Sequence, residues 1–166
     1  MPVDEPGRLK ALHRLQVLDT PREDVFDRLV AVAAQLFETP IALLNLVAAH
    51  RQWAKATFGL DFCQSDRRDA FCTHTILESD PLVVEDPLTD ERFARNPLVL
   101  AEPGIRFYAG APVRTSDGYH VGSLCVIDRT PRTCTADQCD ALQHLAQIAA
   151  AQMETRRAGE HLAKSA

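Results

Sequence analysis

Apolar side chains recur at every third position in residues 5–18, near the start of the chain. This spacing predicts a short amphipathic helix with a narrow apolar stripe. The stripe consists of Leu9, Leu12, Leu15 and Leu18. Such a stripe needs a surface to cover it, and we expect that surface to come from a second copy of the chain.

A second helix is predicted to begin at Thr20. Thr20 is a suitable N-cap residue, Pro21 suits the first helical position, and Glu23 lies three residues after the cap. Because proline cannot continue a helix, Pro40 marks its end. The apolar positions at helical spacing between these limits are Val25, Phe26, Leu29, Val32, Ala33, Leu36 and Phe37.

The last predicted helix begins with the same pattern, because Thr135 and Gln138 can form a capping box. Its buried stripe is predicted from Leu142, Leu145, Ala146, Ala149 and Met153. After Thr155 the sequence becomes polar. We expect the helix to fray there or to lead into a following segment.

The middle of the chain has the pattern of β-strands. Residues 41–47 are apolar at nearly every position, which predicts a strand covered on both faces. Residues 51–58 predict the second arm of a hairpin. Strict alternation would place Trp53, Lys55 and Thr57 on one of its faces and Ala54, Ala56 and Phe58 on the other. Residues 59–69 are predicted to be a loop.

Three further strands are predicted at residues 82–85, 106–113 and 119–128. The last two flank the pair Asp117-Gly118, which is a strong signal for a hairpin turn. Residues 86–105 are expected to be irregular, with a helical turn at residues 90–95.

These elements predict an α+β fold, in which helices from the two ends of the chain lie on one face of an antiparallel sheet. The strands of the last hairpin are apolar on both faces. The second face must therefore be covered too. Only the segments 59–81 and 86–105 remain to cover it.

Composition narrows the class of protein. A chain of 166 residues fits one domain, and its hydrophobic and charged fractions, 46% and 25%, are typical of soluble proteins. The net charge of −5 with scattered arginines argues against a nucleic-acid partner, and the apolar runs are too short to span a membrane. Five cysteines without a C-x-x-C motif predict neither a disulfide framework nor a zinc site. We expect a cytoplasmic protein.

A run of sequence strings resembles one domain family. LDTPREDVFDRL, RQWAKATFGL, RRDAFCTHTI, LVVEDPLTDERFARNPLV, IRFYAGAPV and DGYHVGSLCVIDRTPR, together with the closing helix, resemble a GAF domain of the type found in bacterial sensor histidine kinases and diguanylate cyclases. The resemblance implies the GAF (profilin-like) fold, with five to six antiparallel strands and a small-molecule pocket beneath loops and short helices. It divides the chain into an N-terminal helix (1–19), the GAF domain (20–155) and a polar tail or signalling linker (156–166).

The resemblance implies a non-catalytic regulatory module of bacterial signal transduction, which binds a small molecule, dimerises through its terminal helices, or does both. A downstream kinase or cyclase domain is the implied output partner. No cofactor is assigned. The cyclic-nucleotide signature is not present in order, because Asp90-Glu91 precedes Phe93, and Thr73 separates Cys72 from His74, unlike in bilin-binding relatives.

Two alternatives remain open. GAF-type free methionine-(R)-sulfoxide reductases use cysteines around the pocket, and Cys63 and Cys72 resemble the first two of that set. The third is expected within residues 95–105, where this chain has no cysteine. The second alternative is a structural dimerisation module whose pocket is occluded.

The stretch AFCTHTI carries the main chemical candidates. If Asp69 caps a helix over residues 70–77, Cys72 and His74 lie about 200° apart around its axis and cannot act as a pair. Cys72 is then either a thiolate favoured by the helix start or a small buried apolar residue. Polar tips from neighbouring segments could converge on the pocket, or Arg92 or Arg106 could tether loops by pairing with Asp86 or Asp90. The predicted ligand-binding residues are Phe71, Cys72, His74, Arg92, Phe93, Asn96, Arg106 and Tyr108.

Overall fold

The computed structural model describes the backbone of residues 4–165 and the side chains of residues 4–156. The α-helices are α1 (Glu5–Leu15), α2 (Asp24–Phe37), α3 (Cys72–Thr75), α4 (Pro97–Leu100) and α5 (Ala136–Ser165). The strands are β1 (Ile41–Val47), β2 (Arg51–Phe58), β3 (Gln64–Asp66), β4 (Leu82–Val84), β5 (Phe107–Arg114) and β6 (His120–Asp128). Two 3-10 turns, η1 (Arg67–Asp69) and η2 (Pro87–Thr89), complete these elements.

The strands form one antiparallel sheet in the order β3-β2-β1-β6-β5-β4, which confirms the predicted α+β class. All seven residues of β1 are buried. Ala42, Leu44 and Leu46 belong to one apolar core, whereas Ile41, Leu43 and Val47 belong to another. The sheet is therefore buried on both faces, as the pattern of its strands predicted.

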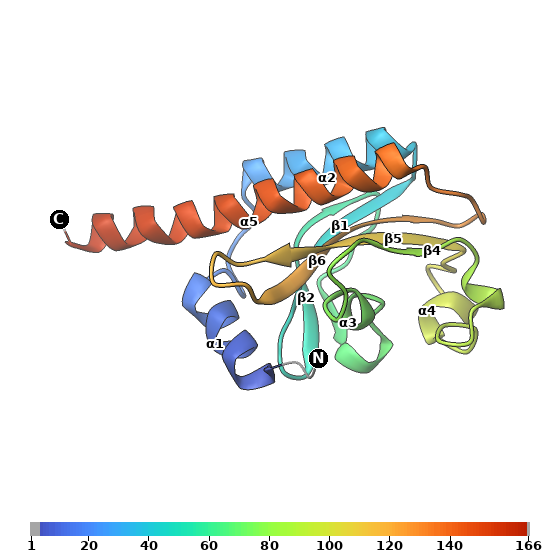
Figure 1. Ribbon diagram of the computed structural model, residues 1–166, viewed down its shortest axis with the longest axis horizontal. Coiled ribbons are helices and arrows are strands. Elements are labelled where there is room, and N and C mark those ends of the chain that lie inside the picture. Colours follow the sequence, from blue (N-terminus) through green and yellow to red (C-terminus); the bar gives the residue numbers. More distant parts are fainter. Residues whose placement is uncertain (1–3, 166) are drawn as a thin grey trace.

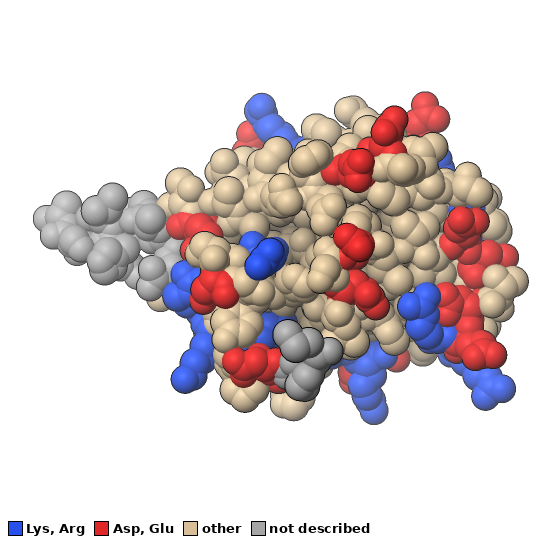
Figure 2. Space-filling model, viewed as in Figure 1, with Lys and Arg blue, Asp and Glu red and all other residues tan. Residues whose placement is uncertain are grey.

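Helices α2 and α5 cover one face of the sheet, side by side, as Figure 1 shows. Segments from the middle of the chain, including α3 and α4, cover the opposite face. Over the side shown in Figure 2, acidic and basic residues are interspersed among uncharged ones. Within the described residues, no helix has the length and apolar character needed to cross a membrane.

Helix α1 differs from the prediction in where it lies and in what covers its stripe. It packs across one end of the sheet (Figure 1), where its Arg14 forms an ion pair with Glu154 of α5 (3.1 Å). Leu12 and Leu15 are buried in the core of this same chain. The apolar stripe is thus already covered, and it does not by itself call for a second copy.

The predicted start of the second helix was wrong by several residues. Helix α2 begins at Asp24, and its N-cap position, Glu23, makes no side-chain cap bond. The Thr20 hydroxyl instead donates to the Val17 carbonyl and accepts a hydrogen bond from Lys55 Nζ (2.8 Å). Thr20 therefore holds a loop against β2 instead of capping a helix.

A β-bulge breaks the predicted alternation in the second strand. Leu44 pairs with Ala56 and Asn45 with Ala54, so Lys55 is the extra residue on β2. Trp53 and Ala56, predicted on opposite faces, therefore both pack in the core beneath α2 and α5. The bulge also turns the buried Lys55 toward the loop before α2, where its ammonium donates to the Pro21 carbonyl (2.6 Å).

Three predicted boundaries also change. The segment 59–69 contains the edge strand β3 and the turn η1, where a loop was predicted. Helix α3 is shorter than predicted, and Phe71 occupies its N-cap position in place of Asp69. The capping box of Thr135 and Gln138 is confirmed, with Gln138 N donating to Thr135 Oγ1 (3.1 Å). After Thr155, where either fraying or a lead into a following segment was expected, helix α5 continues to Ser165.

Candidate functional site

A small cavity lies between the sheet and the segments that cover its second face. Its floor is formed by β1, β2, β5 and β6, and α3 forms one wall. Its volume is about 40 Å³, enough for a water molecule but far below the roughly 300 Å³ of a typical ligand pocket. The lining residues are Leu43, Asn45, Gln52, Leu60, Phe62, Phe71, Cys72, Leu98, Pro103, Ile105, Tyr108, Cys125 and Ile127.

Two amide side chains interrupt this mostly apolar lining. Asn45 donates through Nδ2 to Cys72 Sγ (3.6 Å), and Gln52 donates through Nε2 to Ser65 Oγ (2.9 Å). Their oxygens, Asn45 Oδ1 and Gln52 Oε1, are buried and have no hydrogen-bond partner among the described residues. Neither residue was among the predicted site residues. Asn45 could have been noticed as the one polar residue in the strand IALLNLV.

Tyr108 joins the sheet to α3 beneath the cavity. Its hydroxyl lies 2.7 Å from Thr75 Oγ1, 3.1 Å from Ser123 Oγ and 3.6 Å from Cys72 Sγ. The ring of Phe71 lies 5.1 Å from that of Tyr108. Cys72, Thr75 and Ile76 are all buried, as residues on one face of a helical turn that is turned to the sheet.

Cys72 and Cys125 form a buried pair of thiols in this cavity. The hydrogen bond with Cys125 lowers the pKa of Cys72 to about 7, and the same contact, with burial, raises the pKa of Cys125. Two alternatives were left open for Cys72, a thiolate favoured by a helix start and a small buried residue. Its burial agrees with the second, and the lowering of its pKa comes mainly from the second thiol. Cys125 is fully buried.

The remaining predicted site residues lie outside the cavity lining. His74 packs edge-on against Phe93, which is itself stacked on Phe71 at 4.1 Å. Burial lowers the pKa of His74. Asn96 caps α4 by accepting from Leu98 N, and its Nδ2 donates to the Asp69 carbonyl.

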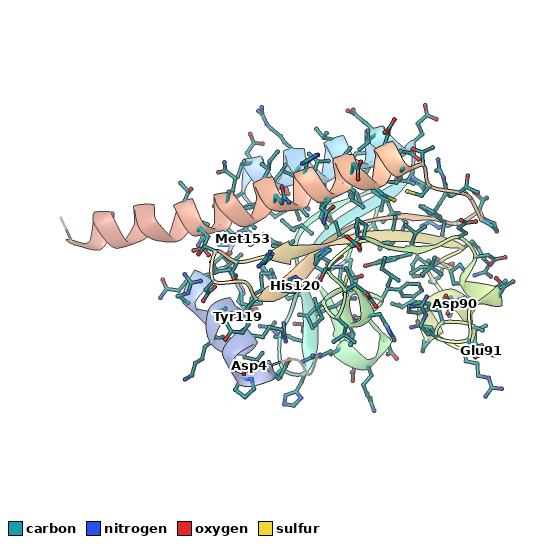
Figure 3. All side chains as sticks on the ribbon, viewed as in Figure 1. Asp4, Asp90, Glu91, Tyr119, His120 and Met153 are labelled. Atoms are coloured by element: carbon teal, nitrogen blue, oxygen red, sulfur yellow. The ribbon has the colours of Figure 1, made fainter. Side chains whose placement is uncertain are left out.

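The two arginines in this set tether the cover. Arg92 forms an ion pair with Asp90 (2.7 Å), as the loop-tethering alternative anticipated. Figure 3 shows Asp90 at the end of the molecule opposite Asp4 and α1. Arg106 pairs with no carboxylate of the described residues and instead donates to the carbonyls of Val99 and Ile105. These side chains hold the cover in place without reaching the cavity.

Comparison with known protein families shows that residues 21–153 match the model of the GAF domain family. The chain belongs to the GAF domain family. A curated relative, the cyclic di-GMP phosphodiesterase PA2567 of Pseudomonas aeruginosa, is 43% identical over 162 residues. These residues make up 97% of this chain but only 28% of that protein. The predicted resemblance to GAF domains of signalling proteins is confirmed.

Solved structures agree with this GAF fold. The GAF domain of a phosphoenolpyruvate-protein phosphotransferase from Coxiella burnetii has a TM-score of 0.70 and 16% identity, covering 95% of this chain and 99% of that one. A type II free methionine-R-sulfoxide reductase from Thermoplasma acidophilum has a TM-score of 0.61 and 15% identity, covering 77% of this chain and 91% of that one. At this level of identity both comparisons support the fold alone.

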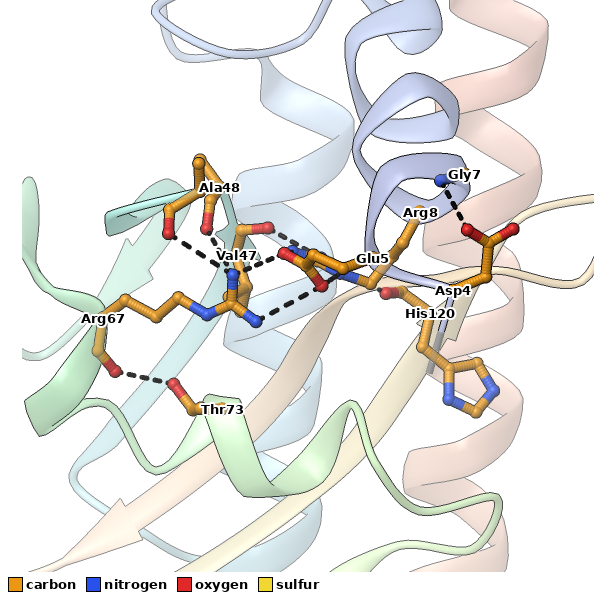
Figure 4. Close-up of polar contacts among 10 residues, drawn as sticks. Asp4, Glu5, Gly7, Arg8, Val47, Ala48, Arg67, Thr73 and His120 are labelled. Carbon is orange, nitrogen blue, oxygen red and sulfur yellow. Dashed lines mark hydrogen bonds and ion pairs between the residues drawn. The ribbon is translucent and has the colours of Figure 1, made fainter. Parts of the chain in front are cut away.

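A charged network connects α1 of the GAF domain to the cavity cover (Figure 4). Arg8, only 1% exposed, donates to both carboxylate oxygens of Glu5 (2.9 Å each) and to the Val47 carbonyl (2.7 Å). Arg67, in η1, donates to the same Glu5 carboxylate (2.6 Å) and to the Ala48 carbonyl (3.1 Å). The Arg67 carbonyl in turn accepts from the hydroxyl of Thr73 in α3 (2.7 Å).

This network strongly lowers the pKa of Glu5. The hydrogen bonds from Arg8, together with those from Arg67, lower the pKa of Glu5 to about 2. Glu5 is therefore ionised in the folded protein at neutral and mildly acidic pH. Its carboxylate joins α1 to Arg67 in η1. The sequence patterns did not predict this contact.

Proposed function

We propose that this GAF domain is a non-catalytic sensory module, in which a small molecule in the cavity is sensed by the cover and reported through the terminal helices. The observation that carries the proposal is an unbroken series of contacts that leads from the cavity to α1. Cys72 lines the cavity, Thr73 next to it is bonded to Arg67, and Arg67 is bonded to Glu5 of α1. A change in the position of α3 therefore acts directly on α1.

A ligand can shift such a domain between two states only if it binds them unequally. In the closed state the cavity has only about 40 Å³. Any ligand larger than water must therefore favour a state in which the cover has moved outward. The ligand therefore binds the open state more tightly than the closed state, and this difference in affinity is what signalling requires.

Dimerisation through the terminal helices is the second part of the proposal. The outer surface of α2 and α5 carries apolar side chains that this chain leaves exposed: Val25 (40%), Val32 (47%), Leu36 (38%) and Ile148 (47%). A parallel pair of chains would cover them with the same residues of the partner. This surface takes over the role first expected of the stripe on residues 9–18.

The dimer contact is tested by placing a charge in this surface. We expect sedimentation equilibrium to give a dimer for the native protein and a monomer for Val32→Glu, because the buried carboxylate would lack a partner. Leu88→Glu is the matched control, since Leu88 is 45% exposed on the cover side. A monomer mass for the native protein at high concentration would contradict this part of the proposal.

Ligand binding is tested by native mass spectrometry of the protein purified from its own host. The expected result is a mass excess that disappears on denaturation. A bare mass, together with no binding from a host metabolite extract, would leave the alternative of a structural dimerisation module. The small volume of the cavity is the observation that favours this alternative.

The reductase alternative finds less support in the geometry. Cys72 is buried in the cavity, whereas Cys63 is exposed in a separate surface groove with Trp53 and Lys55. We propose that neither cysteine serves in catalysis. Turnover of free methionine-(R)-sulfoxide by the native protein, lost in Cys72→Ser, would overturn this.

A further inference from the structure

We infer that the cavity selects a small uncharged molecule with an apolar body, held by its own N–H or O–H donors at Asn45 Oδ1 and Gln52 Oε1. The inference rests on the sensory function proposed above and names the class of ligand. It depends on three observations: two buried acceptors without a partner among the described residues, a lining without acidic or basic residues, and an apolar rim.

The orphan acceptors are the positive signal for a ligand. A buried carbonyl oxygen without a donor costs free energy, so native proteins leave few of them. Here two such oxygens belong to side chains that line one cavity, Asn45 and Gln52, which are only 1% and 4% exposed. The nitrogen of each amide already donates to a neighbour, Cys72 for Asn45 and Ser65 for Gln52, so among the described residues only the oxygens lack a partner. A ligand with donors would satisfy them.

The two amides come from adjacent strands and lie on the same face of the sheet. Gln52 pairs with Val47 in the register of β1 and β2, and Asn45 precedes Val47 by two residues. Residues two apart on a strand point to the same face. The two acceptors are therefore diagonal neighbours, placed to hold two donors of one molecule or one donor and a bridging water.

The lining restricts the charge of the ligand. Among the described residues that line the cavity, none is Asp, Glu, Lys, Arg or His. An ion moved into such a site would lose its hydration without gaining a counter-charge, which is strongly unfavourable. This excludes phosphate-bearing ligands such as a cyclic dinucleotide. It also excludes amino-acid zwitterions, including methionine sulfoxide.

Four apolar residues form the rim of the cavity and determine how a ligand enters. Leu60 and Phe62 lie between β2 and β3, and Leu98 and Pro103 lie on α4 and the segment that leads to β5. Leu60, Phe62 and Leu98 are only partly buried while packed against the core of this face. Outward movement of these side chains enlarges the cavity, and they then close over the apolar body of the ligand.

Three probe molecules test separately the need for a donor and the exclusion of charge. Indole is uncharged and carries one N–H donor, 1-methylindole lacks the donor, and indole-3-acetate adds a negative charge. Dissociation constants are measured by ligand-observed NMR on the native protein. We expect indole to bind about tenfold more tightly than 1-methylindole, because the methylated probe leaves a buried acceptor unsatisfied. Indole-3-acetate is expected not to bind.

Two variants locate the effect. The variants are Asn45→Leu and Gln52→Leu. In the one that removes the acceptor used by indole, indole and 1-methylindole should bind equally. The ligand-free variant should melt no lower than the native protein, since an orphan oxygen is removed. Gln147→Leu, an exposed position on α5, is the matched control and should keep the tenfold preference.

The outcomes distinguish this inference from the sensory proposal. Equal binding of indole and 1-methylindole to the native protein overturns the ligand class and leaves a sensory cavity in place. Preferred binding of indole-3-acetate overturns the exclusion of charge. If no probe binds and a crystal structure shows only a water between Asn45 and Gln52, the inference fails, and native mass spectrometry then decides the sensory proposal separately.

Discussion

The hydroxyl of Tyr108 is the most connected polar atom beneath the cavity. It satisfies the hydroxyls of Thr75 and Ser123, both of which are fully buried. Tyr108→Phe keeps the ring but leaves these two groups without that partner. We expect a loss of about 1–3 kcal/mol in the free energy of unfolding, measured by urea denaturation.

Tyr119→Phe is the matched control for this measurement. Its hydroxyl also makes a hydrogen bond, to Asp4 Oδ2 (2.9 Å), and Figure 3 shows both residues near α1. That bond is exposed, so water can replace it and the loss should be much smaller. Equal losses in the two variants would contradict a structural role for the Tyr108 network.

Glu5 makes the stability of the domain depend on pH. Its pKa is lowered from 4.5 to about 2 in the folded protein, so the folded state favours the ionised form. The resulting stability is fully present above the unfolded pKa of 4.5 and is lost as the pH falls toward 2. Because the carboxylate is 36% exposed, we expect about 1 kcal/mol after solvent screening.

The measurement is the free energy of unfolding between pH 6 and pH 3, in native protein and in Glu5→Gln. The variant should be less stable at pH 6, and the difference should shrink as the pH falls. Asp24→Asn serves as the control, because Asp24 forms an ion pair with Arg28 in which both side chains are highly exposed. A constant difference between Glu5→Gln and native protein across this range would show that the Glu5 charge does not stabilise the fold.

At the scale of elements, the start of α5 combines a capping box with a pair of thiols. Cys134 precedes the N-cap residue Thr135, and Cys139 follows it by four positions, which is the spacing of a hydrophobic staple. Their sulfurs lie 2.9 Å apart. Burial and the contact with Cys139 raise the pKa of Cys134 to about 12, so Cys134 is a poor attacking thiol at neutral pH.

We expect oxidised glutathione to convert this pair into an intramolecular disulfide. The Cys139 thiolate attacks the glutathione disulfide, and the Cys134 thiol then displaces glutathione from the mixed disulfide, with release of two glutathione thiols in all. Alkylation and peptide mass spectrometry should find residues 134 and 139 protected together. Cys134→Ser should instead retain glutathione on Cys139. Cys72→Ser is the control, since it should leave the 134–139 bridge unchanged.

Periodicity predicted most of these elements because each strand and long helix buries a regular set of apolar positions. It failed where a contact distant in sequence decided the outcome. The bulge at Lys55 depends on the loop before α2, and the start of α2 depends on Thr20 bonding to Lys55 instead of to the helix. The Asp69 cap failed because Asp66 caps the preceding turn η1. None of these contacts leaves a periodic signal in the sequence.

The site was predicted in outline and missed in detail. AFCTHTI does cover the second face of the sheet, and Phe71, Cys72 and Tyr108 do line the cavity. The other predicted residues were chosen for their polar tips, which bond to the cover itself. The two amide residues of the lining, Asn45 and Gln52, come instead from the adjacent strands β1 and β2. Sequence gives no direct sign of which polar strand residue faces an enclosed space.

For the whole molecule, the contact of Glu5 with Arg67 connects the two ends of the sensory path. Arg67 holds α1 through Glu5, the turn after β1 through the Ala48 carbonyl, and α3 through Thr73. Arg67→Gln shortens the side chain and removes the charge. We expect faster amide hydrogen exchange both in α1 and in residues 70–76, measured by mass spectrometry, with α5 unchanged.

Arg68→Gln is a closely matched control, because the neighbouring Arg68 forms an ion pair with Asp66 in which its own side chain is 86% exposed. It should leave the exchange of both segments as in the native protein. If Arg67→Gln speeds exchange only near residue 67, then α1 and the cavity cover move independently. The proposed route from cavity to terminal helix would then have to run through the sheet, by way of Tyr108 and β5, instead of through the charged network.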